Sequence, residues 1–439
     1  MDETEVLLND GRYNLRPWVR QKDQHPLAIE RAEGIFLWDY RGKRYFDMSS
    51  QLVNVNLGYG SREINRAIAE QLERFAYIAP AHGAASRSAL AKTLVEKSGG
   101  MAKVFFTCGG AESNDNAAQI ARAFTGRAKI FSAYRSYHGS TQGAGNLSGD
   151  PRRFAVERPA IPGYIKFMAP YIYRETLPFK TEEEISAHYL WVLREQILAE
   201  GPQNIAAITL EAVAGTSGVI IPPKGYLPGI RKLCDEFGIL LHFDEVMTGF
   251  YRTGTLFAFQ NFGVTADIIT FAKGVTSGYV PLGGVLVSHK IAAFYDDNPL
   301  LCGLTYNGHP LSCAAGNAAL RVYDELHIEE HVRRLGAALR NALLDLEQRH
   351  PSIGNVRSIG LFSALELVKN RATKEPLVSA GNLLDALSGI IALLRERGFL
   401  TIGRNNNIMI APPLIITESE LNEALNILDE VLSIVDGSL

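Results

Sequence analysis

Short apolar runs alternate with amphipathic segments through the middle of the chain. The runs have the length of strands and most end in Gly, Pro or polar residues; they are MAKVFFTC (101–108), KIFSAY, AAITLEAV, GILLHFDEV, DIITFA and GGVLVS. After the first run, ESNDNAAQIARAF carries Ala117, Ile120, Ala121 and Phe124 at helical spacing. This alternation predicts an α/β fold with one large, mostly parallel sheet between layers of helices.

Two further segments between the apolar runs carry helix boundary signals. Thr181 with Glu184 matches a capping box, which predicts a helix through about Glu200. KGYLPGIRKLCDEFG predicts a second helix that ends at Gly238. Both helices are expected to connect parallel strands.

The last third of the chain has a different pattern. From about Gly316 it carries long amphipathic helices, a strand region at IGLFSALELV and a final helix after Thr417. We expect three parts: an N-terminal segment (1–60) that joins the small domain, a large cofactor-binding domain (61–315) and a smaller α+β domain (316–439).

Composition narrows the class of partner. The 439 residues are 46% hydrophobic and have a formal net charge of −3, so the total charge gives no footprint for nucleic acid or an anionic membrane. The four cysteines form no CxxC pair, and no metal site is expected. The N-terminus lacks a basic signal region, and no apolar run approaches the roughly 18 to 20 residues of a membrane helix. We therefore expect a cytoplasmic protein that binds small molecules.

A glycine turn lies between the first apolar run and its helix. Gly109, Gly110 and Ala111 would let backbone N–H groups approach an anion at the positive end of the helix dipole, which suits a phosphate. A plain connection is the more common use of such a turn. The turn matches neither a Walker loop nor GxGxxG.

Asp244 and Lys273 each follow a buried strand, where ligands of α/β folds collect. A carboxylate there could hold a protonated pyridine nitrogen, and a partly buried lysine could form an imine. Read singly, Asp244 could equally cap a turn, and most lysines are solvated. Tyr137 follows another strand and could cover a flat cofactor, while His138 suits a structural hydrogen bond. The combination is what favours pyridoxal 5′-phosphate (PLP).

Taken together, the chain resembles the class III, or ω-amino-acid, aminotransferases of PLP fold type I. The resemblance runs from about Pro26 to Leu432 and rests on motifs in the family's order: FFTCGGAESND, YRSYHGST, ITLEAVAGTSGVIIPPKGY, HFDEVMTGFYRTG with ITFAKGVTSGYVPLGG, and GLTYNGHPLSCAA. It implies a large domain with a mostly parallel sheet and a smaller α+β domain.

The resemblance implies a role for each matching residue. Lys273 would carry PLP as a Schiff base, and Asp244 would pair with the pyridine nitrogen. Val246 and Tyr137 would lie on opposite faces of the ring. The other matches would line the cofactor and substrate sites: Gly109, Gly110, Ala111, His138 and Glu211. Thr305 would reach the phosphate of a neighbouring subunit, which implies a homodimer and leaves a tetramer open.

The substrate end departs from the family pattern. FLTIGRNNNIMIAPPL has Ile402 near the place of the usual arginine, and Arg404 lies two residues away, where it could bind an acid or face solvent. SSQLVNVNLGYG and RSYHGSTQGAGNLSGDPRR are most similar to the branch that pairs taurine with pyruvate or 2-oxoglutarate. Leu52, Val53 and Tyr77 are candidates for the pocket wall, or ordinary core residues.

The resemblance implies a ping-pong transfer of an amino group from a small ω-amino acid or amine, like taurine or β-alanine, to a 2-oxo acid. Another PLP enzyme of the same scaffold, such as a racemase, epimerase, aminomutase or decarboxylase, remains an alternative. So does a non-catalytic scaffold, although the retained Lys273 and Asp244 argue against it. A nucleotide-binding oxidoreductase is disfavoured by the missing dinucleotide fingerprint.

Overall fold

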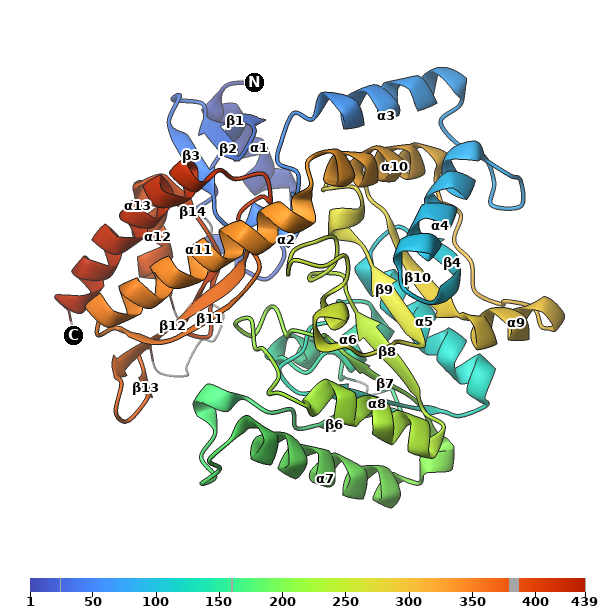
Figure 1. The fold of residues 1–439 in the computed structure, drawn as a ribbon. Helices are drawn as coiled ribbons and strands as arrows, with labels where there is room; N and C mark the ends of the chain where they lie inside the picture. The colour runs from blue at the N-terminus through green and yellow to red at the C-terminus, as the bar shows by residue number, and fades with distance from the viewer. Residues whose placement is uncertain (24, 159–160, 379–386, 439) are drawn as a thin grey trace.

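A seven-stranded sheet forms the centre of the computed structural model, which describes residues 1–23, 25–158, 161–378 and 387–438 (Figure 1). In spatial order its strands are β4 (Met101–Thr107), β10 (Gly283–Ser288), β9 (Ile268–Phe271), β8 (Leu240–Asp244), β7 (Ile205–Leu210), β5 (Lys129–Ala133) and β6 (Tyr164–Phe167). Strands β9, β8, β7, β5 and β6 run parallel, and β10 is antiparallel to both of its neighbours. The predicted mostly parallel sheet is confirmed.

Both faces of this sheet are buried, which explains why its strands read as continuous apolar runs. Successive residues point to opposite faces, so Leu240 and Leu241 belong to two separate hydrophobic clusters. Helix α5 (Gly110–Thr125) covers one face through Ala117 and Ile120, while α8 (Tyr226–Phe237) contacts β8 from the other cluster.

The helix boundary signals are confirmed. Helix α7 (Glu182–Glu200) begins with the capping box formed by Thr181 and Glu184, and it lies outside α8 in Figure 1. Helix α8 ends at Gly238, whose φ of 62° is left-handed.

Two smaller sheets combine the ends of the chain. The first contains β1 (Ile29–Glu33), β2 (Phe36–Asp39), β3 (Arg44–Asp47) and β14 (Phe399–Leu400). The second contains β11 (Ile353–Ile359), β12 (Phe362–Asn370), β16 (Asn407–Ile410) and β15 (Gly403–Arg404), with β13 (Glu375–Pro376) beside β12. Because β3 pairs with β14, the first sixty residues are joined to the C-terminal third. The boundaries at residues 60 and 315 stay a prediction.

Helices α11 (Ile328–Arg349), α12 (Ser388–Glu396) and α13 (Glu418–Asp436) lie together beside these sheets (Figure 1). Helix α10 (Pro310–Glu325) contacts both α3 (Arg62–Arg74) and α4 (Ala85–Lys97), and α9 (His289–Asp297) lies near β4 and β10. Two short helices are α2 (Ser50–Val53), which contributes Leu52 to the site described below, and α6 (Gln142–Leu147), which contacts α5.

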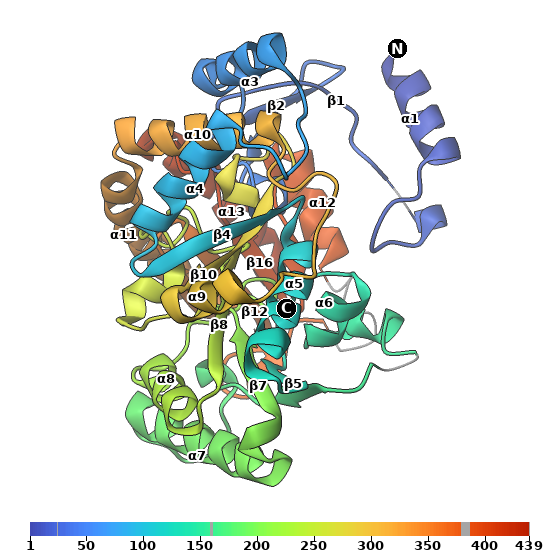
Figure 2. The ribbon, with the colours of Figure 1, turned by 90° about the vertical axis from the view of Figure 1, so that its right-hand side faces the viewer.

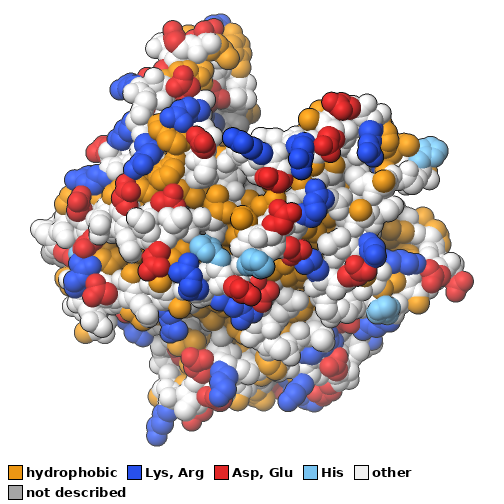
Figure 3. Space-filling view, turned by 45° about the horizontal axis from the view of Figure 1, so that its top comes forward, with side chains coloured by type: hydrophobic (Ala, Val, Ile, Leu, Met, Phe, Trp, Pro, Cys, Tyr) orange, Lys and Arg blue, Asp and Glu red, His pale blue; other side chains and the backbone are white. Residues whose placement is uncertain are grey.

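The N-terminal helix α1 (Glu3–Tyr13) buries none of its residues and lies apart from the sheets in Figure 2. Within the described residues, no helix has the length and apolar character needed to cross a bilayer. Acidic and basic side chains are mixed over the face drawn in Figure 3.

Candidate active site

A cavity of about 680 Å³ opens at the carboxyl ends of β7, β8 and β9, next to the first turn of α5. This is where ligands of parallel α/β sheets bind. Parts of the chain that are far apart in sequence line it: Asp244 ends β8, Lys273 follows β9, Met409 belongs to β16, and Leu52 lies in the segment after β3.

Lys273 is the first residue of a short 3₁₀ turn (Lys273–Val275) directly after β9 and Ala272, and its φ is 49°. Its amine lies inside the cavity. Burial lowers its pKa to about 8; Asp244 and Glu211 oppose this shift, and the positive charge of Arg152 adds to it. A lysine with this pKa is partly unprotonated near neutral pH and can act as a nucleophile or base.

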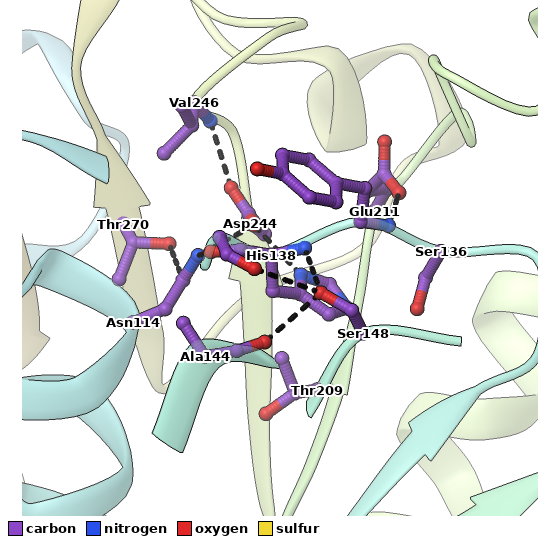
Figure 4. Close-up of polar contacts among 12 residues, drawn as sticks. Asn114, Ser136, His138, Ala144, Ser148, Thr209, Glu211, Asp244, Val246 and Thr270 are labelled. Carbon is purple, nitrogen blue, oxygen red and sulfur yellow. Dashed lines mark hydrogen bonds and ion pairs between the residues drawn. The ribbon is translucent and has the colours of Figure 1, made fainter. Parts of the chain in front are cut away.

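Asp244 is the last residue of β8 and is 3% exposed. Its Oδ2 atom accepts hydrogen bonds from the Asn114 amide and from His138 Nδ1, both at 2.7 Å, and Oδ1 accepts from Val246 N at 3.0 Å (Figure 4). Burial alone would raise the pKa of Asp244, but the hydrogen bond and charge of His138 outweigh it and keep that pKa below its ordinary value. The carboxylate is therefore ionised.

A buried chain of hydrogen bonds leads to Asp244, and the direction of each bond follows from its chemistry. The Asn114 Nδ2 atom faces two acceptors, Asp244 Oδ2 and the His138 carbonyl, so the Asn114 Oδ1 atom faces Thr270 Oγ1 at 2.7 Å and accepts its proton. Thr270 Oγ1 must then accept from His242 Nε2, 3.0 Å away.

His242 completes this chain. Burial lowers its pKa to about 3, so the ring is neutral and its single proton is on Nε2. Nδ1 is then an acceptor for the Thr209 hydroxyl at 3.0 Å. All donors point toward Asp244, and aligned bonds of this kind stabilise the negative charge at their end.

The first turn of α5 fits a phosphate. Gly109 is the N-cap of α5, and Gly110 and Ala111 begin it. A Cβ on Gly110 would meet Val246 Cγ1 at 2.7 Å, so only glycine allows this close approach between α5 and the residue after β8. The turn therefore presents helix N–H groups beside Val246, in the same cavity as Lys273 and Asp244.

Tyr137 and Glu211 face the cavity side by side. Glu211 follows β7 and accepts hydrogen bonds from Tyr137 N at 3.0 Å and Gly215 N at 2.8 Å. Burial raises the pKa of Glu211 to about 7, and Asp244 adds to this shift while His138 opposes it. The Arg152 guanidinium carbon lies 3.4 Å from the centre of the Tyr137 ring, within cation–π range.

Of the remaining candidates from the sequence, two line the cavity and three do not. Leu52 and Arg404 line the cavity. Val53 is 1% exposed and lies in a hydrophobic cluster with Val213 and Phe362. Tyr77 and Thr305 lie together outside the cavity lining, with the Tyr77 hydroxyl donating to the Thr305 carbonyl at 2.7 Å.

Several lining residues were missed by the sequence analysis. Arg152 is the most informative, because it bonds to Asp150 through Nε at 2.8 Å and through Nη2, while Arg404 Nη1 lies 3.7 Å from the same carboxylate. The sequence signal was the SGDPRR stretch, in which Arg152 follows an acid and a proline. Trp18 belongs to the N-terminal segment and gave no pattern that points to a pocket.

A mostly parallel α/β sheet whose cavity holds a buried amine, an ionised carboxylate and a helix N-terminus is the arrangement of a PLP enzyme of fold type I. The donor set fits the cofactor, with a primary amine for its aldehyde, a carboxylate for its ring nitrogen and N–H groups for its phosphate.

Comparison with known proteins defines the family. The model of the class III aminotransferases matches residues 18–432, and the chain belongs to this family. It is similar to the taurine:2-oxoglutarate aminotransferase of Bifidobacterium kashiwanohense, solved in complex with PLP and glutamate, with 48% identity, a TM-score of 0.97 and coverage of 100% of this chain and 99% of that one. It is 31% identical to the taurine–pyruvate aminotransferase of Bilophila wadsworthia, over 99% of this chain and 98% of that protein. It is 33% identical to the mitochondrial gamma-aminobutyrate transaminase 1 of Oryza sativa subsp. indica, over 93% of this chain and 82% of that protein. The protein is an aminotransferase that uses PLP, with an amino donor and a keto acid acceptor.

Proposed function

We propose that this enzyme transfers the amino group of a small ω-amino acid or amine with a distal acidic group, such as taurine or β-alanine, to pyruvate or 2-oxoglutarate in a ping-pong cycle. The observation that carries the proposal is that two guanidinium groups of the cavity lining, those of Arg152 and Arg404, share the single carboxylate of Asp150 behind them.

This cluster suits a sulfonate or carboxylate. The side chains of Arg152, Arg404 and Asp150 are 12%, 18% and 5% exposed, and together they carry one excess positive charge. Burial lowers the pKa of Arg404, as does Arg152, while Asp150 opposes the shift. An acidic substrate group would neutralise the excess charge and could accept hydrogen bonds from both guanidinium groups.

Lys273 and Asp244 have the central roles in the proposed chemistry. PLP, when bound, withdraws electrons from the carbon that carries the amino group of the donor. We assign Lys273 to carry the cofactor and then to move the proton from that carbon, a task for which a pKa of about 8 is suitable. The ionised Asp244 would keep the cofactor's ring nitrogen protonated. Gly109, Gly110 and Ala111 would bind the phosphate, and Val246 and Tyr137 would enclose the ring.

Glu211 and His138 would support these groups. Glu211 accepts from Tyr137 N and so fixes the loop that carries the Tyr137 ring. His138 is bonded to Asp244 at 2.7 Å and would orient the carboxylate.

We also propose that the active unit is a homodimer. Thr305 and Tyr77 lie beside the exposed Tyr306, whose ring is 5.8 Å from that of Tyr77. Leu301, in the same connection between α9 and α10 as Thr305, is 91% exposed. A second copy that covers this surface would bring Thr305 to the phosphate site of its neighbour. Sedimentation of the purified protein tests this proposal, which a monomer with full activity would contradict.

Single-turnover spectroscopy tests the substrate proposal. We expect taurine, β-alanine or 4-aminobutyrate to bleach the visible band of bound cofactor and pyruvate or 2-oxoglutarate to restore it, whereas propylamine reacts much more slowly. Product formation without a keto acid would instead favour a racemase, mutase or decarboxylase. No reaction with any acidic amine would refute the role of the two arginines.

A further inference from the structure

Arg252 is completely buried, between the site and the C-terminal sheets. Its Nη1 atom donates to the carbonyls of Leu361 at 3.0 Å and Pro412 at 2.6 Å. Its Nη2 atom donates to Ser50 Oγ at 3.1 Å and Asn56 Oδ1 at 3.2 Å. One guanidinium group therefore joins the turn after β8, the segment after β3 and two segments of the C-terminal third.

These partners are neutral. Among the described residues, no carboxylate forms an ion pair with Arg252, and burial lowers its pKa to about 10. A buried charge is costly unless hydrogen bonds replace its hydration, so the four oxygen atoms stabilise the buried guanidinium group. Without the arginine, these buried oxygen atoms would in turn lose a hydrogen-bond donor.

The segment that Arg252 holds is strained. Ser50, Gln51 and Val53 have φ values of 47°, 57° and 57°, a left-handed conformation that is unfavourable for a β-branched residue such as Val53. Such a conformation persists only when surrounding contacts impose it. Leu52 and Asn54 of this segment line the cavity, so the strained backbone is also part of the pocket wall.

The same contacts reach the turn of Lys273. Asn56, a partner of Arg252, lies so close to Gly274 that a Cβ there would meet Asn56 Nδ2 at 2.6 Å, and Asn56 also donates to the Phe250 carbonyl at 3.0 Å. Lys273, with its φ of 49°, immediately precedes Gly274. Through Asn56, Arg252 is thus linked to the backbone of the residue that follows Lys273, without touching Lys273 itself.

We propose that Arg252 is a positioning residue that holds the strained wall segment 50–56 in place and thereby sets the size of the donor pocket. The selectivity part of this proposal rests on the proposed acidic amine donors, whereas the role of Arg252 in holding the wall does not depend on them.

Hydrogen–deuterium exchange of the apoprotein tests the wall directly. The Val53, Asn54 and Val55 amides donate to the carbonyls of Ser49 or Ser50, so their exchange reports opening of the segment. In Arg252→Lys, which keeps the charge but not the planar fork, we expect exchange in 50–57 to be faster by about tenfold or more. Arg127→Lys is the matched control, because Arg127 also donates to three carbonyls, those of Ile205, Phe237 and Gly238, and should leave 50–57 unchanged.

Selectivity between a small and a bulky amine donor shows whether Arg252 positions the pocket wall or only stabilises the fold. We compare kcat/KM for β-alanine and for 3-amino-3-phenylpropanoate, which share the amine and acid but differ in bulk. We expect Arg252→Lys to raise the ratio of bulky to small donor by about fivefold or more, since a relaxed wall discriminates less. Equal losses for both donors, or unchanged exchange in 50–57, would overturn the proposal.

Ser50→Ala provides a second variant if Arg252→Lys fails to fold. It removes the Ser50 hydroxyl, which accepts from Arg252 and donates to the Ala411 carbonyl at 2.7 Å, and it keeps the bonds of Arg252 to Leu361 and Pro412. We expect the same changes as in Arg252→Lys but smaller ones; no change in either measurement would count against the proposal. If the wild-type enzyme accepts no acidic amine, the proposed donor class is wrong, while the exchange experiment still decides the role of Arg252.

Discussion

Replacing Thr270 with valine tests the hydrogen-bond chain behind Asp244. Valine has nearly the same shape as threonine but can neither donate to Asn114 Oδ1 nor accept from His242 Nε2, the bonds of 2.7 Å and 3.0 Å in the native chain. Thr270 is fully buried, so water cannot replace the lost hydroxyl. The substitution therefore leaves two buried polar atoms without partners and creates no cavity.

The expected cost follows from this count. Each unsatisfied buried group costs about 1–3 kcal/mol, so we expect Thr270→Val to lower the free energy of unfolding of the apoprotein by about 2–6 kcal/mol. Thr209→Val affects one partner, His242 Nδ1, and should cost roughly half as much. Thr270→Ser keeps the hydroxyl and loses one methyl group, a cost of about 1 kcal/mol. Denaturant unfolding measures all three.

Two results would refute this reasoning. One is equal stability of Thr270→Val and Thr270→Ser, because loss of the hydroxyl group would then cost no more than loss of one methyl group, and the two hydrogen bonds would contribute little. The other is a ¹⁵N spectrum in which His242 is protonated on Nδ1, or becomes cationic between pH 5 and 8, because the deduced direction requires a neutral ring with its proton on Nε2.

Three further predictions concern the cavity and the proposed interface. Burial lowers the pKa of Lys273 from 10.5 to about 8, so between these pH values the lysine is protonated only in the unfolded state and its contribution makes the apoprotein more stable as the pH rises. Lys273→Met should remove this pH dependence and should raise the free energy of unfolding of the apoprotein at pH 7 by up to about 3 kcal/mol, as measured by denaturant titration. Arg152→Leu should lower kcat/KM for taurine by about 10²–10³ and leave propylamine nearly unchanged, and Arg404→Leu should cost about tenfold; equal losses for both amines would contradict an acid-binding role. Leu301→Glu places a charge on the proposed dimer surface and should shift the sedimenting species toward monomer, whereas an unshifted dimer would place the interface elsewhere.

The sequence predicted most of the large sheet because its strands are buried on both faces. Continuous apolar runs of strand length, such as DIITFA, favour interior strands. The helix boundary signals at Thr181 and Gly238 depend on neighbouring residues alone, so both boundaries could be predicted without knowledge of the tertiary structure. The direction of β10, which is antiparallel to both of its neighbours, could not be predicted in this way, because GGVLVS has the same apolar pattern as the parallel strands of the sheet.

The cavity wall was harder to predict for a physical reason. Leu52 and Val53 are adjacent and apolar, yet Leu52 lines the cavity and Val53 is buried in a hydrophobic cluster, and the positive φ angles at Ser50, Gln51 and Val53 break the regular helix or strand pattern from which such placements are read. Arg152 resembles any loop arginine until the fold brings it onto the Tyr137 ring. Such placements depend on contacts between segments that are far apart in sequence.

In the proposed function the cavity must distinguish two anions, the phosphate of the cofactor and the acid of the donor. The phosphate end uses backbone N–H groups of α5 in a turn that Val246 keeps narrow, and the guanidinium groups among the described lining residues lie instead around Asp150. The N–H groups at a narrow helix N-terminus favour a compact phosphate. The guanidinium groups, on flexible side chains, can also bind planar carboxylates. Because the two anions are bound by different chemistry, an acidic donor at high concentration should not displace the phosphate. The PLP dissociation constant of the wild-type enzyme should therefore stay the same when the unreactive acid propanesulfonate saturates the donor end, and a competitive rise would show that the two ends are not separate.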